Sequence, residues 1–215
     1  MRTVVLDGRQ ALLARPRGAR HLVMLAHGAG AGMRHDFMAA IAGALDARRV
    51  ATVRWEFPYM AAGRARPDRA AVAEAAVRAT WDAVAASAHA RGLAMFAGGK
   101  SFGSRMTSQA HAAAPLAGAR GLIFLGFPYR SEPKRAEHLP RAAGPMLFLQ
   151  GTRDELAELG ELRPIVAALG ARAALHVVDG ADHAFSVLRR SGRGDDDVIA
   201  ELADAIAAWT DRVAR

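Results

Sequence analysis

Residues 99–103 of the sequence read Gly-Lys-Ser-Phe-Gly. It lies between a short apolar run, residues 93–97, and a segment with a helical pattern, residues 104–113. Gly-x-Ser-x-Gly between a strand and a helix is typical of a nucleophile elbow, a sharp turn that strains the serine backbone and exposes its hydroxyl. The pattern predicts that Ser101 is a nucleophile if the chain also supplies a base, an orienting acid and oxyanion donors.

The rest of the chain alternates between apolar runs and helical patterns. Residues 3–6 and 11–14 predict an antiparallel hairpin around Asp7-Gly8. Continuous apolar runs, typical of parallel strands covered on both faces, occupy residues 22–26, 50–55, 93–97, 121–125, 145–149 and 174–178. Helices are expected at residues 37–48, 68–89, 104–113, 156–169 and 196–213, and a loop with a short helix at 130–141. The order predicts a single α/β domain over residues 1–215, with a mostly parallel sheet flanked by helices and no large cap.

Composition narrows the class of protein. The chain has 215 residues, of which 52% are hydrophobic and 23% charged, as in soluble globular proteins. The formal net charge is +8, and only Lys100 and Lys134 among the 29 basic residues are lysines. The arginines are scattered without a basic run, which indicates compositional bias and argues against nucleic acid as the main partner.

Targeting and redox features are sparse. The chain contains no cysteine, which excludes disulfides and thiolate metal sites. Residues 1–10 do not resemble a signal peptide, and no apolar run approaches the roughly 20 residues that span a bilayer. We therefore expect a cytoplasmic protein without membrane contact, acting as a monomer or homodimer.

Three residues that follow apolar runs are candidates for the catalytic machinery. Ser101, Asp154 and His183 come in the chain order expected for a Gly-x-Ser-x-Gly elbow. Functional residues of open α/β sheets gather at the carboxyl ends of strands. We predict that His183 is the base for Ser101 and that Asp154 orients His183. Asp179 and Asp182 are alternatives for the acid, although Asp182 adjoins the histidine and adjacent residues rarely reach the required geometry.

The oxyanion of an acyl-transfer intermediate needs preorganised donors. In an elbow of this kind the residue after the nucleophile supplies one backbone N–H, here Phe102. The loop after an earlier strand supplies the other, and within residues 27–30 we predict Ala29, with Gly30 as the alternative.

Two other interpretations of the motifs fail on their spacing. Gly99-Lys100-Ser101 resembles the end of a phosphate-binding loop, but that pattern requires a glycine where Ala94 stands inside an apolar run. His27, His35, Asp36 and His183 show no metal-ligand spacing, so neither a metal nor a cofactor is expected.

Aromatic and arginine residues near strand ends are candidates for substrate contact. An apolar acyl site can draw on aromatic residues, namely Phe57, Tyr59, Phe102, Phe127 and Tyr129. A substrate carboxylate can bind an arginine, namely Arg54, Arg105 or Arg130. Aromatic residues at such places are also typical of the core, and arginines of the solvated surface.

These motifs together resemble the α/β-hydrolase superfamily over essentially the whole chain, in particular its small capless dienelactone-hydrolase-like members. The chain is also similar to a narrower family of uncharacterised bacterial hydrolases that includes a testis-expressed protein and a subunit of a histone-acetyltransferase complex. Four segments carry that likeness, residues 27–30, 57–60, 98–105 and 151–154. The resemblance implies Ser101 as nucleophile, Asp154 as acid and His183 as base. Characterised dienelactone hydrolases typically use cysteine as nucleophile, so their substrate does not transfer.

The leading hypothesis is a serine hydrolase that cleaves a small ester or thioester through an acyl-enzyme on Ser101. An alternative from another class is a binding or scaffolding protein that keeps the fold with little catalysis, because fold does not determine function. A third hypothesis, binding of an anion or nucleic acid, rests on the net charge alone.

Overall fold

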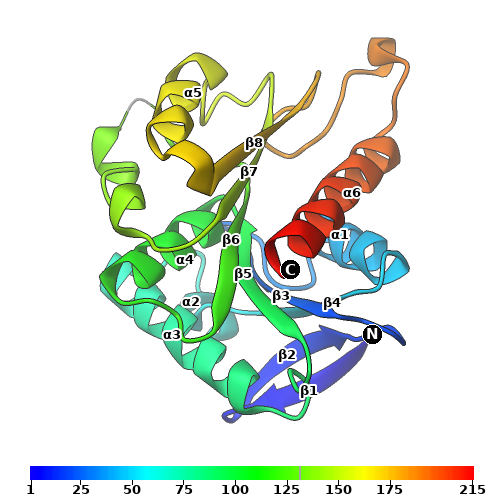
Figure 1. Ribbon diagram of the computed structural model, residues 1–215, viewed down its shortest axis with the longest axis vertical. Helices are drawn as coiled ribbons and strands as arrows, with labels where there is room; N and C mark the ends of the chain where they lie inside the picture. The colour runs from blue at the N-terminus through cyan, green and yellow to red at the C-terminus, as the bar shows by residue number, and fades with distance from the viewer. Residues whose placement is uncertain (131) are drawn as a thin grey trace.

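A β-sheet runs through the middle of the protein, which is described over residues 1–130 and 132–215 in a computed structural model (Figure 1). Its eight strands within those residues are β1 (Arg2–Leu6), β2 (Arg9–Ala14), β3 (His21–Ala26), β4 (Val50–Trp55), β5 (Ala94–Lys100), β6 (Ala119–Leu125), β7 (Met146–Gly151) and β8 (Ala173–Val178). Strands β3 to β8 pair in parallel, whereas β1 and β2 form an antiparallel hairpin that joins the sheet at β4. The predicted fold class is confirmed.

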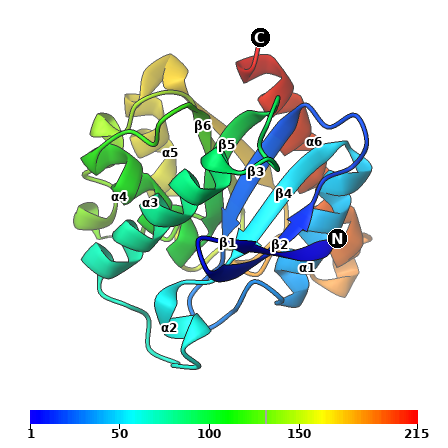
Figure 2. The same cartoon turned by 90° about the horizontal axis from the view of Figure 1, so that it is seen from below.

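Helices cover both faces of this sheet (Figure 2). One face carries α1 (Asp36–Ala47) and α6 (Asp195–Val213), and the other carries α3 (Ala70–Ala86), α4 (Phe102–Ala113) and α5 (Leu159–Ala168). Short elements complete the fold, namely α2 (Pro58–Ala61) and the 3₁₀ turns η1 (Pro133–Arg135), η2 (Leu139–Arg141), η3 (Gly170–Arg172) and η4 (Arg189–Ser191). Because helices lie on both sides, every residue of β3 and of β4 is buried.

The strand order is β1-β2-β4-β3-β5-β6-β7-β8, so β4 and β5 lie on opposite sides of β3. The direction in which successive strands are added reverses at this point. In open α/β sheets the crevice beyond the carboxyl ends of the strands at such a switch point is where ligands bind. The loop after β3 and the elbow after β5 therefore meet at the place in the fold that favours a site.

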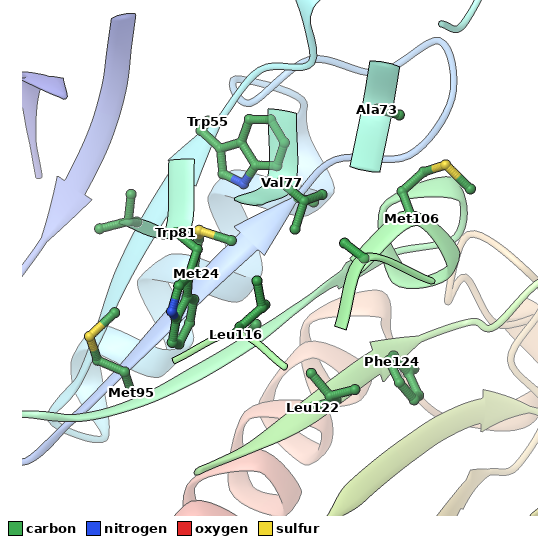
Figure 3. Close-up of a cluster of buried hydrophobic side chains, with 14 of the residues drawn as sticks. Met24, Trp55, Ala73, Val77, Trp81, Met95, Met106, Leu116, Leu122 and Phe124 are labelled. Atoms are coloured by element: carbon green, nitrogen blue, oxygen red, sulfur yellow. The ribbon is translucent and has the colours of Figure 1, made fainter. Parts of the chain in front are cut away.

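Apolar side chains of α3 and α4 pack in one cluster with those of the strands beneath them (Figure 3). Val77 and Trp81, about one helical turn apart in α3, are buried in one cluster with Met24 of β3 and Leu122 of β6. The Trp81 indole donates a hydrogen bond to the Ala117 carbonyl at 3.0 Å. Each large apolar side chain buried in this way contributes roughly 1.5–3 kcal/mol to stability.

The ends of several elements differ from the sequence-based expectation. The strand expected at residues 93–97 continues as β5 to Lys100, because Gly98 and Gly99 let neighbouring strands approach. A Cβ at Gly98 would lie 2.1 Å from the Ile123 carbonyl oxygen. The helix expected at 68–89 occupies only Ala70–Ala86, and that at 156–169 only Leu159–Ala168. Sequence patterns missed α2, which is shorter than two helical turns. In the stretch 130–141, residue 131 lies outside the described residues.

Candidate active site

The turn between β5 and α4 has the strained geometry of an elbow. Ser101 has φ 50° and ψ −112°, a conformation that costs a non-glycine residue of order 1–3 kcal/mol. Gly103 allows α4 to approach β3, since a Cβ there would lie 2.5 Å from the Ala26 carbonyl oxygen. The Ser104 hydroxyl donates to the Gly99 carbonyl and ties the first turn of α4 back to β5. The glycines on either side of Ser101 thus serve close backbone packing, as the motif predicts.

A hydrogen-bond chain joins the three residues predicted for catalysis. Ser101 Oγ lies 2.9 Å from His183 Nε2, and His183 Nδ1 lies 2.8 Å from Asp154 Oδ2. The residues follow β5, β7 and β8, and the parallel sheet brings the ends of these strands to one edge. The Asp154 side chain has no exposed surface, whereas the His183 side chain is 24% exposed. The Asp154 carboxylate is thus shielded from solvent, whereas the His183 imidazole is accessible to a ligand.

Asp154 is held by partners that sequence reasoning missed. The Leu156 N–H donates to Asp154 Oδ1 at 2.8 Å, and the Gln150 side-chain amide donates to Oδ2. The Gln150 side-chain oxygen accepts the Phe127 N–H at 3.0 Å, so Gln150 bridges the ends of β6 and β7. The sequence feature that could have indicated this role is that Gln150, a polar residue, directly follows the apolar run 146–149 in a buried strand.

The two alternative acids have other partners. Asp182 Oδ1 accepts the N–H groups of Ala184 and Ser186, both at 2.9 Å, and so shapes the loop that carries the histidine. Asp179 Oδ1 accepts the Thr152 hydroxyl at 3.4 Å. Within the described part of the chain, the carboxylate hydrogen-bonded to His183 is that of Asp154.

The loop after β3 passes beside the elbow and carries a predicted oxyanion donor. A Cβ at Gly28 would lie 3.8 Å from Ser101 Cβ. The Ala31 N–H donates to the Gly28 carbonyl at 3.3 Å, and Gly30 has φ 74°, so residues 28–31 form a turn that favours glycine at this position. Phe102 is the first residue of α4, and the N–H of a first helical residue has no acceptor within its own helix. The predicted donors Ala29 and Phe102 therefore lie on segments that adjoin Ser101.

His27 anchors this loop from within the core. The His27 side chain is fully buried, with Nδ1 2.8 Å from the Gly28 carbonyl oxygen. The Phe57 N–H donates to Nε2 at 3.1 Å, so the ring is neutral with its proton on Nδ1. Burial lowers the pKa of His27, which keeps the ring neutral. His27 thus fixes the loop after β3 against the segment after β4.

A second pair of contacts fixes the far end of the same loop. Arg54 Nη1 donates to the Met33 carbonyl at 2.9 Å, and the Met33 N–H donates to Glu56 Oε1 at 3.2 Å. The backbone N–H and the carbonyl of Met33 are therefore both hydrogen-bonded to side chains at the end of β4. Arg54 is 2% exposed, so its guanidinium is buried against this loop and does not lie at the solvated surface.

A cavity of about 640 Å³ opens beside Ser101 and His183. Its volume falls within the range of about 300–1,000 Å³ that is usual for small-molecule sites. The apolar part of its lining comprises Ala29, Ala31, Phe37, Met38, Leu156 and Ala184. Polar and charged lining groups are His35, Lys100, Arg153, Glu155 and Asp182. The hydrogen-bond chain thus ends at a space that is large enough for a small organic molecule and is apolar over much of its wall.

The family model for the alpha/beta hydrolase domain matches residues 19–211. The chain belongs to the alpha/beta hydrolase family. Among solved structures, a dienelactone hydrolase from Anabaena variabilis ATCC 29413 is similar at 18% identity and a TM-score of 0.77, over 97% of this chain and 94% of that one. A serine hydrolase without a lid from Xanthomonas campestris is similar at 19% identity and a TM-score of 0.75, over 97% and 94%.

A third similar structure is an alpha-beta serine hydrolase homologue from Coxiella burnetii, at 20% identity and a TM-score of 0.74, over 96% of this chain and 95% of that one. At these identities the likeness shows the fold alone. The family and the fold are therefore established by comparison, whereas the roles of individual residues rest on the geometry of this alpha/beta hydrolase.

The residues predicted for substrate contact lie elsewhere in this alpha/beta hydrolase. Phe57 and Tyr59 have no exposed surface and pack against the rings of His27 and Phe102. The remaining candidates are the buried Phe102, Phe127 and Arg54, the half-buried Tyr129 and Arg105, and the exposed Arg130. Among the described residues that line the cavity, none of these candidates occurs, and Phe37, Met38 and Leu156 supply its larger apolar side chains instead.

The structure also bears on phosphate-binding, metal-binding and membrane-spanning features. Residues 94–100 form a continuous strand, which leaves no room for a phosphate-binding loop before Lys100. Over the described residues, no group of three His, Asp or Glu side chains is arranged to hold a metal ion. In the same part of the chain, every helix is too short or too polar to cross a membrane.

Proposed function

We propose that this alpha/beta hydrolase is a serine hydrolase that cleaves a small ester or thioester through an acyl-enzyme on Ser101. The observation that carries the proposal is the unbroken hydrogen-bond chain from Asp154 through His183 to Ser101, which ends at an open cavity. A serine hydroxyl is a weak nucleophile until a base accepts its proton, and this chain supplies the base and its orienting acid.

The proposed reaction begins with attack of Ser101 Oγ on the carbonyl carbon of the substrate, while His183 Nε2 takes the hydroxyl proton. Asp154 stabilises the imidazolium through Nδ1. The N–H groups of Phe102 and Ala29 stabilise the tetrahedral oxyanion. His183 then returns the proton to the leaving alcohol or thiol as the bond to the acyl carbon breaks. Water, deprotonated by His183, releases the acid and restores Ser101.

The cavity favours small substrates with an apolar part. Phe37, Met38 and Leu156 line the same cavity as Ser101 and supply its larger apolar side chains. The name of the Anabaena relative indicates a lactone substrate for that protein, but the nucleophile proposed here is a serine in a chain without cysteine. We therefore propose for this chain the same class of reaction, acyl transfer to water. We do not propose a lactone as its substrate. Membership of the narrower family of uncharacterised hydrolases is part of the same proposal and rests on the four sequence segments.

A fluorophosphonate probe tests the nucleophile directly. We expect the wild-type protein to be labelled at Ser101 and Ser101→Ala to remain unlabelled. Ser108→Ala is a matched control, because Ser108 also contacts a histidine, His138, in the structure. Labelling of the control should equal that of the wild type.

A panel of p-nitrophenyl esters and acyl thioesters of increasing chain length then defines the substrate class. Turnover that Ser101→Ala abolishes supports the proposal. A folded wild-type protein that neither binds the probe nor turns over any member of the panel would refute it and favour the scaffold hypothesis.

A further inference from the structure

Lys100 precedes the proposed nucleophile and turns its side chain toward the loop that carries the proposed base. The residue is 9% exposed, and its Nζ donates a hydrogen bond to the His183 carbonyl at 2.5 Å. Nζ also lies 5.3 Å from the centre of the Phe185 ring and 5.8 Å from that of Phe37. The ammonium is thus enclosed by two aromatic rings and a backbone carbonyl, beside the cavity that it helps to line.

An ammonium in this place is costly, and the mechanism proposed above does not use it. Burial removes water from the charge, and a buried cation is normally compensated by an ion pair. Among the ion pairs of the described residues, none involves Lys100, although the charges of Asp154 and Asp182 lie close enough to favour its protonated form. Its observed hydrogen-bond acceptor is therefore a backbone carbonyl of the loop that carries His183.

Gly126 shows how closely Lys100 and His183 share their space. This glycine follows β6 with φ 65°, and a Cβ there would lie 3.0 Å from Lys100 Nζ and 3.4 Å from His183 Nδ1. The close contact between Lys100 and the loop of His183 thus requires a residue without a side chain, Gly126, at the end of β6.

We propose that Lys100 is a positioning residue that ties the backbone of His183 to the elbow and so keeps His183 Nε2 within hydrogen-bond reach of Ser101. Lys100 and Ser101 are consecutive, so a contact from Lys100 to the histidine loop limits the separation of nucleophile and base. A hydrogen bond from an ammonium is roughly twice as strong as one between neutral groups. This inference rests on the proposed function, because it assigns Lys100 a role in the same reaction.

The charge on Lys100 makes this tether depend on pH. Burial lowers the pKa of Lys100 to about 8, against the opposing effect of Asp154 and Asp182. His183 is in direct contact, and His35, Arg153 and Glu155 are the other titratable groups of the cavity lining. As the pH rises through about 8, the ammonium loses its proton and the tether weakens. We expect kcat to fall over this range.

Two substitutions of Lys100 test the role. Lys100→Met keeps an unbranched side chain against the aromatic rings but removes the donor. We expect its kcat on the best p-nitrophenyl ester to be lower by about tenfold at pH 7 with KM changed by less than about twofold, because the loss of one charge-assisted hydrogen bond acts on the geometry of the base. The kcat of this variant should lack the fall near pH 8.

Lys100→Arg retains a charged donor at every accessible pH, so it should recover part of the lost kcat and extend activity to higher pH than the wild type. Lys134→Met is the matched control, since Lys134 is the other lysine of the chain and is exposed in η1. Its kcat and pH profile should equal those of the wild type.

Each outcome decides the question. Wild-type kcat in Lys100→Met, a change confined to KM, or an unchanged fall near pH 8 in that variant would overturn the role. If Lys100→Met fails to fold, the wild type and Lys100→Arg still test it, because a wild type without a fall near pH 8 contradicts the tether. A wild type that reacts with neither fluorophosphonate nor esters would instead reject the proposed function, and this inference with it.

Discussion

Ser101 and Ser108 lie seven residues apart, and each contacts a histidine, but only the first pair has the other parts of a catalytic site within the described residues. Ser101 Oγ lies 2.9 Å from His183 Nε2, and Ser108 Oγ lies 2.7 Å from His138 Nε2. The Ser108 hydroxyl also donates to the Arg105 carbonyl at 2.9 Å, a backbone group of the same helix. The two pairs are therefore similarly close, but the Ser108 hydroxyl also has a backbone acceptor within its own helix.

The surroundings of the two pairs differ as well. His183 Nδ1 contacts Asp154, whereas His138 Nδ1 is buried without a hydrogen-bond partner among the described residues. Ser101 has a positive φ at an elbow beside a cavity, whereas Ser108 is buried inside α4. A serine beside a histidine is thus a candidate nucleophile only when a carboxylate contacts the histidine, a cavity adjoins the serine, and the serine lies at a strained turn.

The largest expected effect separates the two histidines. His183→Ala should lower kcat by about 10⁶-fold, the scale found when a triad base is removed. His138→Gln should leave kcat within about threefold, because His138 touches neither the cavity nor the proposed nucleophile. Steady-state ester hydrolysis with both variants measures this, and a comparable loss in His138→Gln would break the distinction.

A smaller effect is expected for the acid. Asp154→Asn should lower kcat by about 10⁴-fold, because an amide at this position no longer favours the tautomer and charge that His183 needs. Asp179→Asn is the matched control from the loop after β8 and should retain nearly full kcat, since Asp179 contacts Thr152. If the two variants lose activity equally, the assignment of the acid is wrong.

We expect His138, which is buried, to affect the stability of the protein rather than its kcat. Burial lowers the pKa of His138 to about 4, helped by the charges of Arg141 and Arg105. Below its ordinary pKa of 6.5 the unfolded chain binds a proton that the folded chain does not, so stability falls as the pH decreases toward 4. The loss from this group is about 3 kcal/mol between pH 7 and pH 4.

Urea unfolding of the wild type and of His138→Gln at both pH values measures this contribution. The variant should lose less stability on acidification, although some dependence remains because burial also lowers the pKa of His27 and of His111. Equal acid sensitivity of the two proteins would show that His138 is not the group responsible.

The sequence predicted the features that depend on local patterns. Apolar runs located the strands, and a parallel sheet places all their carboxyl ends at one edge, so the proximity of Ser101, Asp154 and His183 followed from chain order. This reasoning predicted the fold class, which the structure confirms. It also predicted that the three residues lie close together, as their hydrogen-bond chain shows.

Contacts that depend on long-range packing were not predictable in this way. The direction of the Lys100 side chain is set by Phe185 and the His183 carbonyl, which are more than 80 residues away. Gln150 bridges Phe127 and Asp154 only because β6 and β7 are neighbours. Phe57 and Tyr59 follow a strand end, as the aromatic wall of a site often does, but they point into the core around His27. Strand ends are therefore predictable, whereas the direction of each side chain there is not.

Ser101, which lines the cavity beside His183, also offers a route to chemical tagging. The chain contains no cysteine, so Ser101→Cys would introduce a solitary thiol at the mouth of the cavity. The replacement is nearly isosteric and leaves Gly99 and Gly103 of the elbow unchanged. A maleimide dye or a spin label would then attach at one defined atom, without any background thiols to remove first. The same composition that excludes disulfides from this protein thus makes its candidate site addressable by spectroscopy.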